Sequence, residues 1–231
     1  MPREGTIGEQ VLAAVDAELV AHGLARRSRQ GRYTRPRPHG ADIYYLIVNR
    51  YTGLIVVAPD VAVRHEVVER IFHRTSGFRP AQQRTTPTIG GRLAELTRDP
   101  SYEVEIGPDD APQELRRAER NLRASVDEAE RYWARYADLR EVDHALNDHL
   151  EQDTPHRPMP WLRCSTGLIV ARLVQRPDDD ELARVYLRQM RAFSDGFYLP
   201  RFQALVDYLA ERTTEQLLAE NQGPGPGRGR R

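Results

Sequence analysis

The sequence predicts an α+β protein: an N-terminal helix and a small, mostly antiparallel sheet, followed by an all-helical C-terminal half. Two observations predict this class. Short segments rich in β-branched and aromatic residues lie before residue 107, and apolar residues recur at three-and-four spacing through most of the chain after it. Because the two kinds of segment are separated along the chain and do not alternate, α+β is favoured over a parallel α/β fold.

The first element is predicted to be an amphipathic helix over residues 7–22. Its apolar residues follow helical spacing, and Gly23 is suited to the cap at its C-terminal end. Residues 24–37 contain six arginines and no acidic residue. This segment is predicted to be an outer strand or hairpin arm that turns around Gln30 and Gly31.

A β-hairpin is predicted from residues 42–48 and 54–58, because both segments are rich in β-branched and aromatic residues. Pro59 is expected to close the second strand, and a helix is expected over 63–74. The remaining sheet elements are an edge strand or loop within 85–96, which leads into a helical turn, and a strand over 102–106. The expected sheet has three to five strands.

The C-terminal half is predicted to be helical. Residues 112–150 indicate one long helix or two joined by a bend, and helices are also expected over 177–193 and 200–218. The apolar segment 161–175 is compatible with a strand or a helix, and we expect a helix. The tail 223–231 (GPGPGRGRR) has no side chain suited to a core and is expected to be disordered.

These patterns divide the chain into four predicted regions. They are an α+β sheet domain, a long helix, a C-terminal helical region and a disordered tail, over residues 1–110, 111–156, 157–220 and 221–231 respectively.

The charged residues exclude several kinds of catalytic chemistry. The 34 basic residues balance 34 acidic ones, and every basic residue is Arg. Without lysine there can be no Schiff-base lysine, lysine general base or phosphate-loop lysine. With a single cysteine, Cys164, there can be no intramolecular disulfide and no thiolate metal cluster. No apolar run reaches the length of a signal peptide or a membrane span, so we expect a cytoplasmic protein without a membrane partner.

The N-terminal half resembles a class of uncharacterised bacterial domains over about residues 8–106. The resemblance lies in a leading helix that ends at His22-Gly23-Leu24, a basic strand containing Gly31-Arg32-Tyr33, and then an apolar hairpin and a helix. Some such domains are suspected immunity or accessory proteins in bacterial competition. The resemblance therefore implies a bacterial immunity or accessory factor, and it transfers no catalytic residue.

The densest group of metal-ligating residue types lies at the end of the long predicted helix. Its candidate ligands would serve a metal-dependent enzyme. However, His144 and His149 are five residues apart, which separates them by about 140° around a helix, whereas ligands on one face are three or four residues apart. We expect no cofactor, and the candidate ligands are Asp143, His144, His149 and His156.

Arginines at the two ends of the chain would allow weak nucleic-acid binding, because cations that contact phosphates release counterions. The opposing interpretation is that charge on an outer strand prevents edge-to-edge pairing. We consider nucleic acid the less favoured partner. The candidate residues are Arg26, Arg27, Arg29, Arg32, Arg35, Arg228, Arg230 and Arg231.

The favoured prediction is a non-enzymatic protein-binding factor, without catalytic residues. Tyr132, Trp133 and Tyr136 lie close together on the long predicted helix, and such aromatic residues often anchor interfaces. The same residues would equally cover a sheet. We therefore expect the partner to be another protein, with a second copy of this chain as an alternative, and the partner-binding candidates are these three aromatics.

Overall fold

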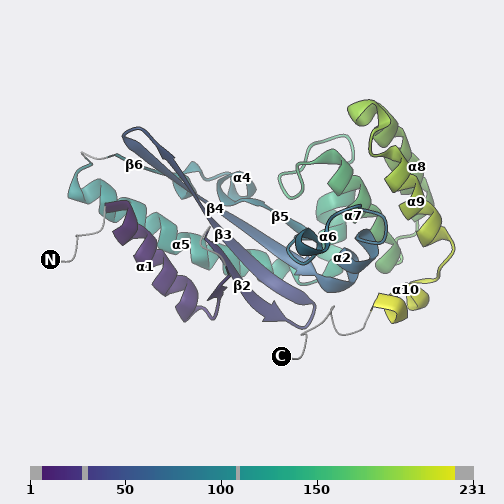
Figure 1. The fold of residues 1–231 in the computed structure, drawn as a ribbon, viewed down its shortest axis with the longest axis horizontal. Coiled ribbons are helices and arrows are strands. Elements are labelled where there is room, and N and C mark those ends of the chain that lie inside the picture. The colour runs from purple at the N-terminus through teal and green to yellow at the C-terminus, as the bar shows by residue number, and fades with distance from the viewer. Residues whose placement is uncertain (1–6, 28–30, 108–109, 222–231) are drawn as a thin grey trace. The chain divides into compact units, whose positions relative to one another are not determined.

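The structure is a computed structural model of the 231-residue chain, and it describes residues 7–27, 31–107 and 110–221 (Figure 1). The chain forms two compact units. Unit 1 comprises Met1–Val63 and Gly90–Arg135, and unit 2 comprises Arg64–Ile89 and Tyr136–Arg231. Residues 64–89 thus belong with the C-terminal helices, although the sequence pattern assigned them to the N-terminal sheet region.

The α+β class predicted from the sequence is confirmed, because strands precede most of the helices. The strands at 25–26, 32–37 and 40–51 pair antiparallel in chain order, and those at 54–65 and 104–106 also pair antiparallel. The described residues form a six-stranded sheet, one strand more than the largest sheet expected. Its order is β1-β2-β3-β4-β5, and β6 also pairs with β4. The strands are β1 (Ala25–Arg26), β2 (Arg32–Arg37), β3 (Gly40–Tyr51), β4 (Leu54–His65), β5 (Ile89–Arg92) and β6 (Val104–Ile106).

Strand β4 is longer than predicted, because Pro59 does not end it. The strand pairs with β6 over Ile55–Val57, and a Cβ on Gly90 of β5 would lie 2.5 Å from the carbonyl oxygen of Val61. Pro59 therefore lies between the segment that pairs with β6 and the segment that β5 approaches. The helix expected over 63–74 is accordingly shorter, since the residues up to His65 remain in the strand.

In unit 1, helices α1 (Ile7–Ala21) and α5 (Pro112–Tyr136) lie along the sheet (Figure 1). Polar contacts of two α5 side chains connect this helix to strands β3 and β4. The Ser125 hydroxyl lies 2.7 Å from that of Tyr44, and the indole N–H of Trp133 donates to the carbonyl oxygens of Ile43 (3.3 Å) and Ala62 (3.1 Å). The unit also contains α4 (Leu93–Thr97) and the 3-10 helix η1 (Pro100–Tyr102).

The predicted segment 112–150 forms two helices, α5 and α6 (Leu139–Asn147). Asp138 separates them, because its backbone is extended and its carboxylate accepts a hydrogen bond from the Arg140 N–H at 2.9 Å. A side-chain cap of this kind begins a new helix. Of the two alternatives left open by the sequence, two helices joined by a bend is confirmed.

Unit 2 is built around α7 (Pro160–Leu173), which packs against five other helices. The helix expected over 161–175 is confirmed. Most of its residues are buried, and a helix buried all round lacks a polar face, which made its sequence compatible with a strand. Its neighbours are α2 (Glu66–Phe72), α6, α8 (Asp179–Ala192), α9 (Leu199–Ala210) and α10 (Thr214–Asn221).

The last predicted helix, 200–218, also forms two helices, α9 and α10, since the residues between Ala210 and Thr214 are not helical. Helix α10 runs to Asn221, which is 3% exposed. Asn221 therefore does not belong to a disordered tail as predicted, and residues 223–231 lie outside the described residues. Among the described helices, none combines the length and the apolar character needed to cross a bilayer.

Candidate functional site

The candidate site in unit 2 is organised around the carboxylate of Glu69, which is 0% exposed. The Thr88 hydroxyl donates to its Oε1 at 2.9 Å, and the Thr86 hydroxyl donates to its Oε2. The Arg64 guanidinium and the His73 ring lie 3.6 and 3.5 Å from Oε2. A buried carboxylate is tolerated only when its charge and lone pairs are matched. These four contacts supply that match and join α2 to the segment that precedes β5.

Thr86 also orients the side chains of Arg64 and His73 around Glu69. Arg64 donates to the carbonyl oxygen of Thr86 at 2.6 Å, and the His73 Nε2 lies 2.8 Å from the Thr86 hydroxyl oxygen. Because the Thr86 hydrogen goes to Glu69, the Thr86 oxygen accepts from Nε2. The Nδ1 of His73 lies 2.9 Å from the hydroxyl of Ser76, which is only 2% exposed. Both ring nitrogens are thus occupied inside the unit.

A second carboxylate, Glu66, lies one helical turn before Arg70. Its two oxygens accept from the Nε of Arg64 (2.9 Å) and the Nε of Arg70 (3.0 Å). Burial opposes ionisation of Glu66, but these two guanidiniums outweigh it and hold the pKa of the carboxyl below its ordinary value. Arg70 also donates to the carbonyl oxygen of Asn221 at 3.0 Å, which ties α2 to the end of α10.

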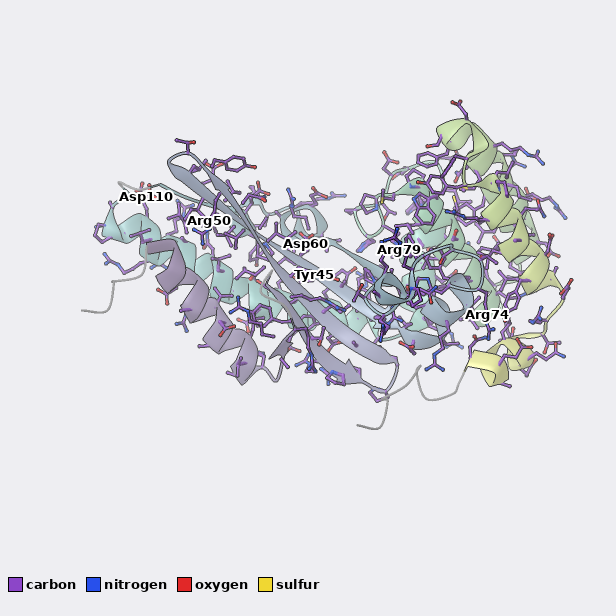
Figure 2. All side chains as sticks on the ribbon, in the orientation of Figure 1. Tyr45, Arg50, Asp60, Arg74, Arg79 and Asp110 are labelled. Atoms are coloured by element: carbon purple, nitrogen blue, oxygen red, sulfur yellow. The ribbon has the colours of Figure 1, made fainter. Side chains whose placement is uncertain are left out.

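These elements line an open pocket of about 730 Å³, which we call the arginine pocket. Its volume is in the range that small-molecule sites occupy. Helix α2 supplies one wall, α3 (Pro80–Gln83) a second, and the end of α10 a third, and Figure 2 shows Arg74 where α2 approaches α10. The pocket is lined by Arg64, Glu66, Arg70, His73, Arg74, Pro80, Gln83, Arg84, Glu220 and Asn221.

Positive charge exceeds negative charge in this lining, with four arginines against two glutamates. Glu66 is shared by Arg64 and Arg70, and Glu220 is held by Arg212, which does not line the pocket, at 3.1 Å. The exposed Arg74 and Arg84 form no ion pair within 4.0 Å among the described residues. Guanidinium groups bind carboxylates and phosphates through charge-assisted, often bidentate, hydrogen bonds. The pocket can therefore bind an anionic group.

The four metal candidates are not brought together. Asp143 accepts from Arg176 at 2.9 Å, His144 pairs with Asp148 at 2.8 Å, and His156 lies against Tyr136, with the two ring centroids 5.0 Å apart. In the described ranges, no group of three or more His, Cys, Asp and Glu side chains is arranged to hold a metal ion. Arg176 takes the place that a cation would have beside Asp143 and Asp148, and the backbone carbonyl oxygen of His149 accepts a hydrogen bond from Arg163 at 2.8 Å.

The predicted partner-binding aromatics are buried within the chain. Tyr132, Trp133 and Tyr136 are 8%, 2% and 3% exposed. Trp133 packs on the sheet, and the Tyr136 carbonyl oxygen lies 2.8 Å from the Nε2 of His65. The sequence left open whether these aromatics anchor an interface or cover the sheet, and in the structure they have the position of core residues. Cys164 is buried too, and burial raises the pKa of its thiol to about 12, so the thiol does not ionise near neutral pH.

Of the four N-terminal candidate arginines that the structure describes, Arg26 and Arg35 pair with acids of unit 1. Arg35 binds both carboxylate oxygens of Glu130 at 2.7 Å and Asp42 at 3.0 Å, and Arg26 lies 3.8 Å from Asp16. Such pairing reduces the positive field that a nucleic-acid backbone would meet. Arg27 donates to the Thr34 hydroxyl at 2.9 Å, and Arg32 lies over the ring of Tyr45. Arg29, Arg228, Arg230 and Arg231 lie outside the described residues.

The arginine pocket was not predicted from the sequence. One local signal was available: Glu66 and Arg70, like Glu69 and His73, are four residues apart, so each pair lies on one face of a helix. The remaining walls come from distant parts of the chain. Arg70 and the Asn221 that it contacts are 151 positions apart.

The fold and the site define an α+β chain whose helical unit carries an arginine-lined pocket. No family model matches this chain, and no curated protein or solved structure matches it either.

The buried carboxylate should dominate the stability of unit 2. We expect Glu69→Gln to lower the free energy of unfolding by about 3 kcal/mol, because it leaves Arg64 without its buried counter-charge and replaces one acceptor by a donor. Urea denaturation followed by circular dichroism measures this change. The exposed Glu151→Gln in the same unit is the control and should change the free energy by less than about 0.5 kcal/mol. Equal effects of the two substitutions would refute the role of Glu69.

The ion pairs of Glu66 predict a pH dependence of stability. Since the folded-state pKa of Glu66 lies below its ordinary value of 4.5, its ionised form stabilises the fold above that pH, and the stabilisation disappears as pH falls through the lower folded-state value. Glu66 is partly exposed, so we expect Glu66→Gln to cost about 1 kcal/mol or less at neutral pH. Unfolding measured from about pH 7 to pH 3 should show the wild-type advantage shrinking below about pH 5. An advantage that stays constant would contradict this assignment.

Proposed function

We propose that this protein acts by binding, and that the arginine pocket binds a small anionic molecule. The observation that carries the proposal is the excess of guanidinium groups in a pocket of about 730 Å³. A pocket of this size suits a small ligand, and a planar fork of donors suits a carboxylate or a phosphate.

The arrangement of the arginines supports a site that exists before the ligand binds. Arg64 is 7% exposed and is held by Glu66, Glu69 and the Thr86 carbonyl oxygen, and Arg70 is held by Glu66 and by the end of α10. Groups that are already ordered lose little conformational entropy on binding. Arg84 is oriented as well, because its Nε donates to the carbonyl oxygen of Pro80 at 3.3 Å.

The charge balance of the pocket supports an anion over a cation. Glu66 and Glu220 already accept hydrogen bonds from arginines, and both carboxyls have pKa values held below their ordinary range. Arg74 and Arg84 are the cations of the lining that an anion would neutralise. Each charge-assisted hydrogen bond of this kind contributes about 1.5–3 kcal/mol.

Titration with inorganic phosphate and with sulfate tests the proposal. We expect saturable binding by calorimetry and a higher Tm in the presence of either anion, because a ligand of the folded state stabilises it. Arg74→Gln and Arg84→Gln should each weaken binding by about tenfold or more, since each removes one charge-assisted contact.

The matched control is Arg188→Gln, an exposed arginine of α8 that does not line the pocket. This substitution should leave the affinity unchanged. The proposal would be overturned if the wild-type protein bound neither anion, or if all three variants bound equally.

Binding of another protein, the function that the sequence predicts, is the second candidate. It is favoured by two exposed apolar side chains of unit 2, Phe197 (69%) and Met159 (53%). Phe197 is followed in the chain by Tyr198, and Met159 lies two residues before Trp161; the rings of Tyr198 and Trp161 stack with centroids 4.6 Å apart. Large apolar side chains on a rigid base are frequent anchors of interfaces.

The backbone conformation before Phe197 also supports a binding surface at this side chain. Ser194 and Asp195 have φ values of 48° and 50°, and Gly196 has 74°. Residues other than glycine rarely adopt this left-handed conformation, which costs about 1–2 kcal/mol each. Strain of this kind is retained where the surrounding structure or a function requires it. An immunity or accessory role would place the partner on this surface.

Substitution of Phe197 tests the second candidate. We expect Phe197→Ser to reduce recovery of a specific partner from an extract of the source cell by about tenfold, because a buried aromatic anchor contributes 2 kcal/mol or more. Tyr51→Ser is the control, since Tyr51 is 62% exposed but belongs to unit 1. Quantitative mass spectrometry of the captured proteins gives the ratio. Unchanged recovery with Phe197→Ser would remove this surface from consideration.

A further inference from the structure

Two of the four arginines that line the arginine pocket are matched by carboxylates of the same wall. The Nε of Arg64 lies 2.9 Å from Glu66, and its Nη1 lies 3.6 Å from the buried Glu69. Arg70 shares Glu66, at 3.0 Å. Two guanidiniums thus face two carboxylates, so this group has no excess charge to offer a ligand.

The other carboxylate of the lining, Glu220, is matched as well. Its Oε2 accepts from the Nε of Arg212 at 3.1 Å and from the Tyr208 hydroxyl at 3.0 Å, and Arg212 does not line the pocket. Arg74 and Arg84 remain, and neither has a carboxylate within 4.0 Å in the described part of the chain. The lining therefore has an excess of two positive charges, and these two arginines carry it.

The two arginines belong to different walls of the pocket. Arg74 follows α2, and Arg84 caps the C-terminal end of α3, where its Nε donates to the carbonyl oxygen of Pro80. A carboxylate has one negative charge and two oxygens on one edge, which a single guanidinium can bind in two parallel hydrogen bonds. A phosphate monoester has about 1.5 to 2 negative charges at neutral pH and three acceptor oxygens. One phosphate group can therefore bind both arginines and neutralise both charges.

From this excess of two charges and from its position on two walls, we infer that the ligand of the arginine pocket carries a phosphate group in its dianionic form, bound jointly by Arg74 and Arg84. Inorganic phosphate and a small phosphate monoester share this chemistry, and a pocket of about 730 Å³ has room for an organic group beside the phosphate. This inference rests on the proposed anion-binding function and narrows its ligand class from anions to phosphate dianions.

The first test compares probes that differ in charge and in its distribution. Ethyl phosphate is a dianion, diethyl phosphate and propionate are monoanions, and succinate has its two charges on separate carboxylates. We expect ethyl phosphate to bind the wild-type protein about tenfold more tightly than each of the other three, because it alone offers both arginines charge-assisted contacts from one group. Inorganic phosphate, titrated alongside, separates the two sources: tighter binding of ethyl phosphate indicates an ester, and tighter binding of inorganic phosphate indicates the free ion.

A change of pH tests the dianion directly. The second ionisation of a phosphate monoester has a pKa of about 6, so ethyl phosphate is mostly a monoanion at about pH 5, whereas sulfate remains a dianion. Between about pH 7.5 and about pH 5 we expect the affinity for ethyl phosphate to fall about tenfold relative to that for sulfate. Sulfate is the control for protonation of the protein, including that of His73, Glu66 and Glu220 in the lining.

Two variants locate the preference at the arginines. Arg74→Gln and Arg84→Gln each remove one of the two excess charges, so each should reduce the preference for ethyl phosphate over propionate several-fold. Both side chains are exposed, and circular dichroism checks that each variant is folded. Arg188→Gln, on α8, is the matched control and should leave the preference unchanged.

The outcomes separate the two proposals. If none of the probes binds, the anion-binding function fails. If propionate, succinate or diethyl phosphate binds as tightly as ethyl phosphate, or if acidification weakens ethyl phosphate and sulfate equally, the anion-binding function stands and the phosphate dianion is overturned. Full preference in both Arg74→Gln and Arg84→Gln would overturn the joint binding by these two arginines.

Discussion

The structure of unit 2 depends on the charge of Glu69. A carboxylate that is removed from water must be matched by donors and by positive charge, and the cost of leaving it unmatched exceeds the contribution of most single contacts in a protein. The partners of Glu69 come from the end of β4, from α2 and from the segment before β5. Satisfying one carboxylate thus fixes three parts of the backbone relative to one another.

The pocket follows from this constraint and from helical periodicity. Glu69 points into the unit, whereas Glu66, Arg70 and Arg74 are four residues apart on another face and form the pocket wall together with His73. Arg64 belongs to both groups, since it approaches Glu69 on one side and binds Glu66 on the other. A buried network therefore supports the side chains that a ligand would contact, in the way that outer contacts orient the residues of a binding site.

The helices of unit 2 meet closely at α7. A Cβ on Gly167 would lie 2.5 Å from the side-chain oxygen of Asn147 and 2.7 Å from the hydroxyl of Tyr186, so only glycine permits the hydrogen bond of 2.6 Å between these two groups. Asn147 also donates to the Gly167 carbonyl oxygen at 3.0 Å. Asp143, one of the four metal candidates, lies at this junction, where it accepts from Asn147 at 2.6 Å and where Arg176 joins it to Asp148. The ion pair of Asp143 with Arg176 connects α6 to the chain after α7.

The sequence by itself determined the α+β class, the central hairpin and most of the helices, because these features follow from local periodicity and from residue propensities. It also determined which chemistry is excluded, since a chain without lysine cannot use one. Only the tertiary structure decided that Trp133 lies in the core, that Pro59 stays within a strand, and that Arg70 meets Asn221. The physical reason is that burial, strand pairing and charge compensation join residues far apart in the chain, and no local pattern specifies which distant partner a side chain will find.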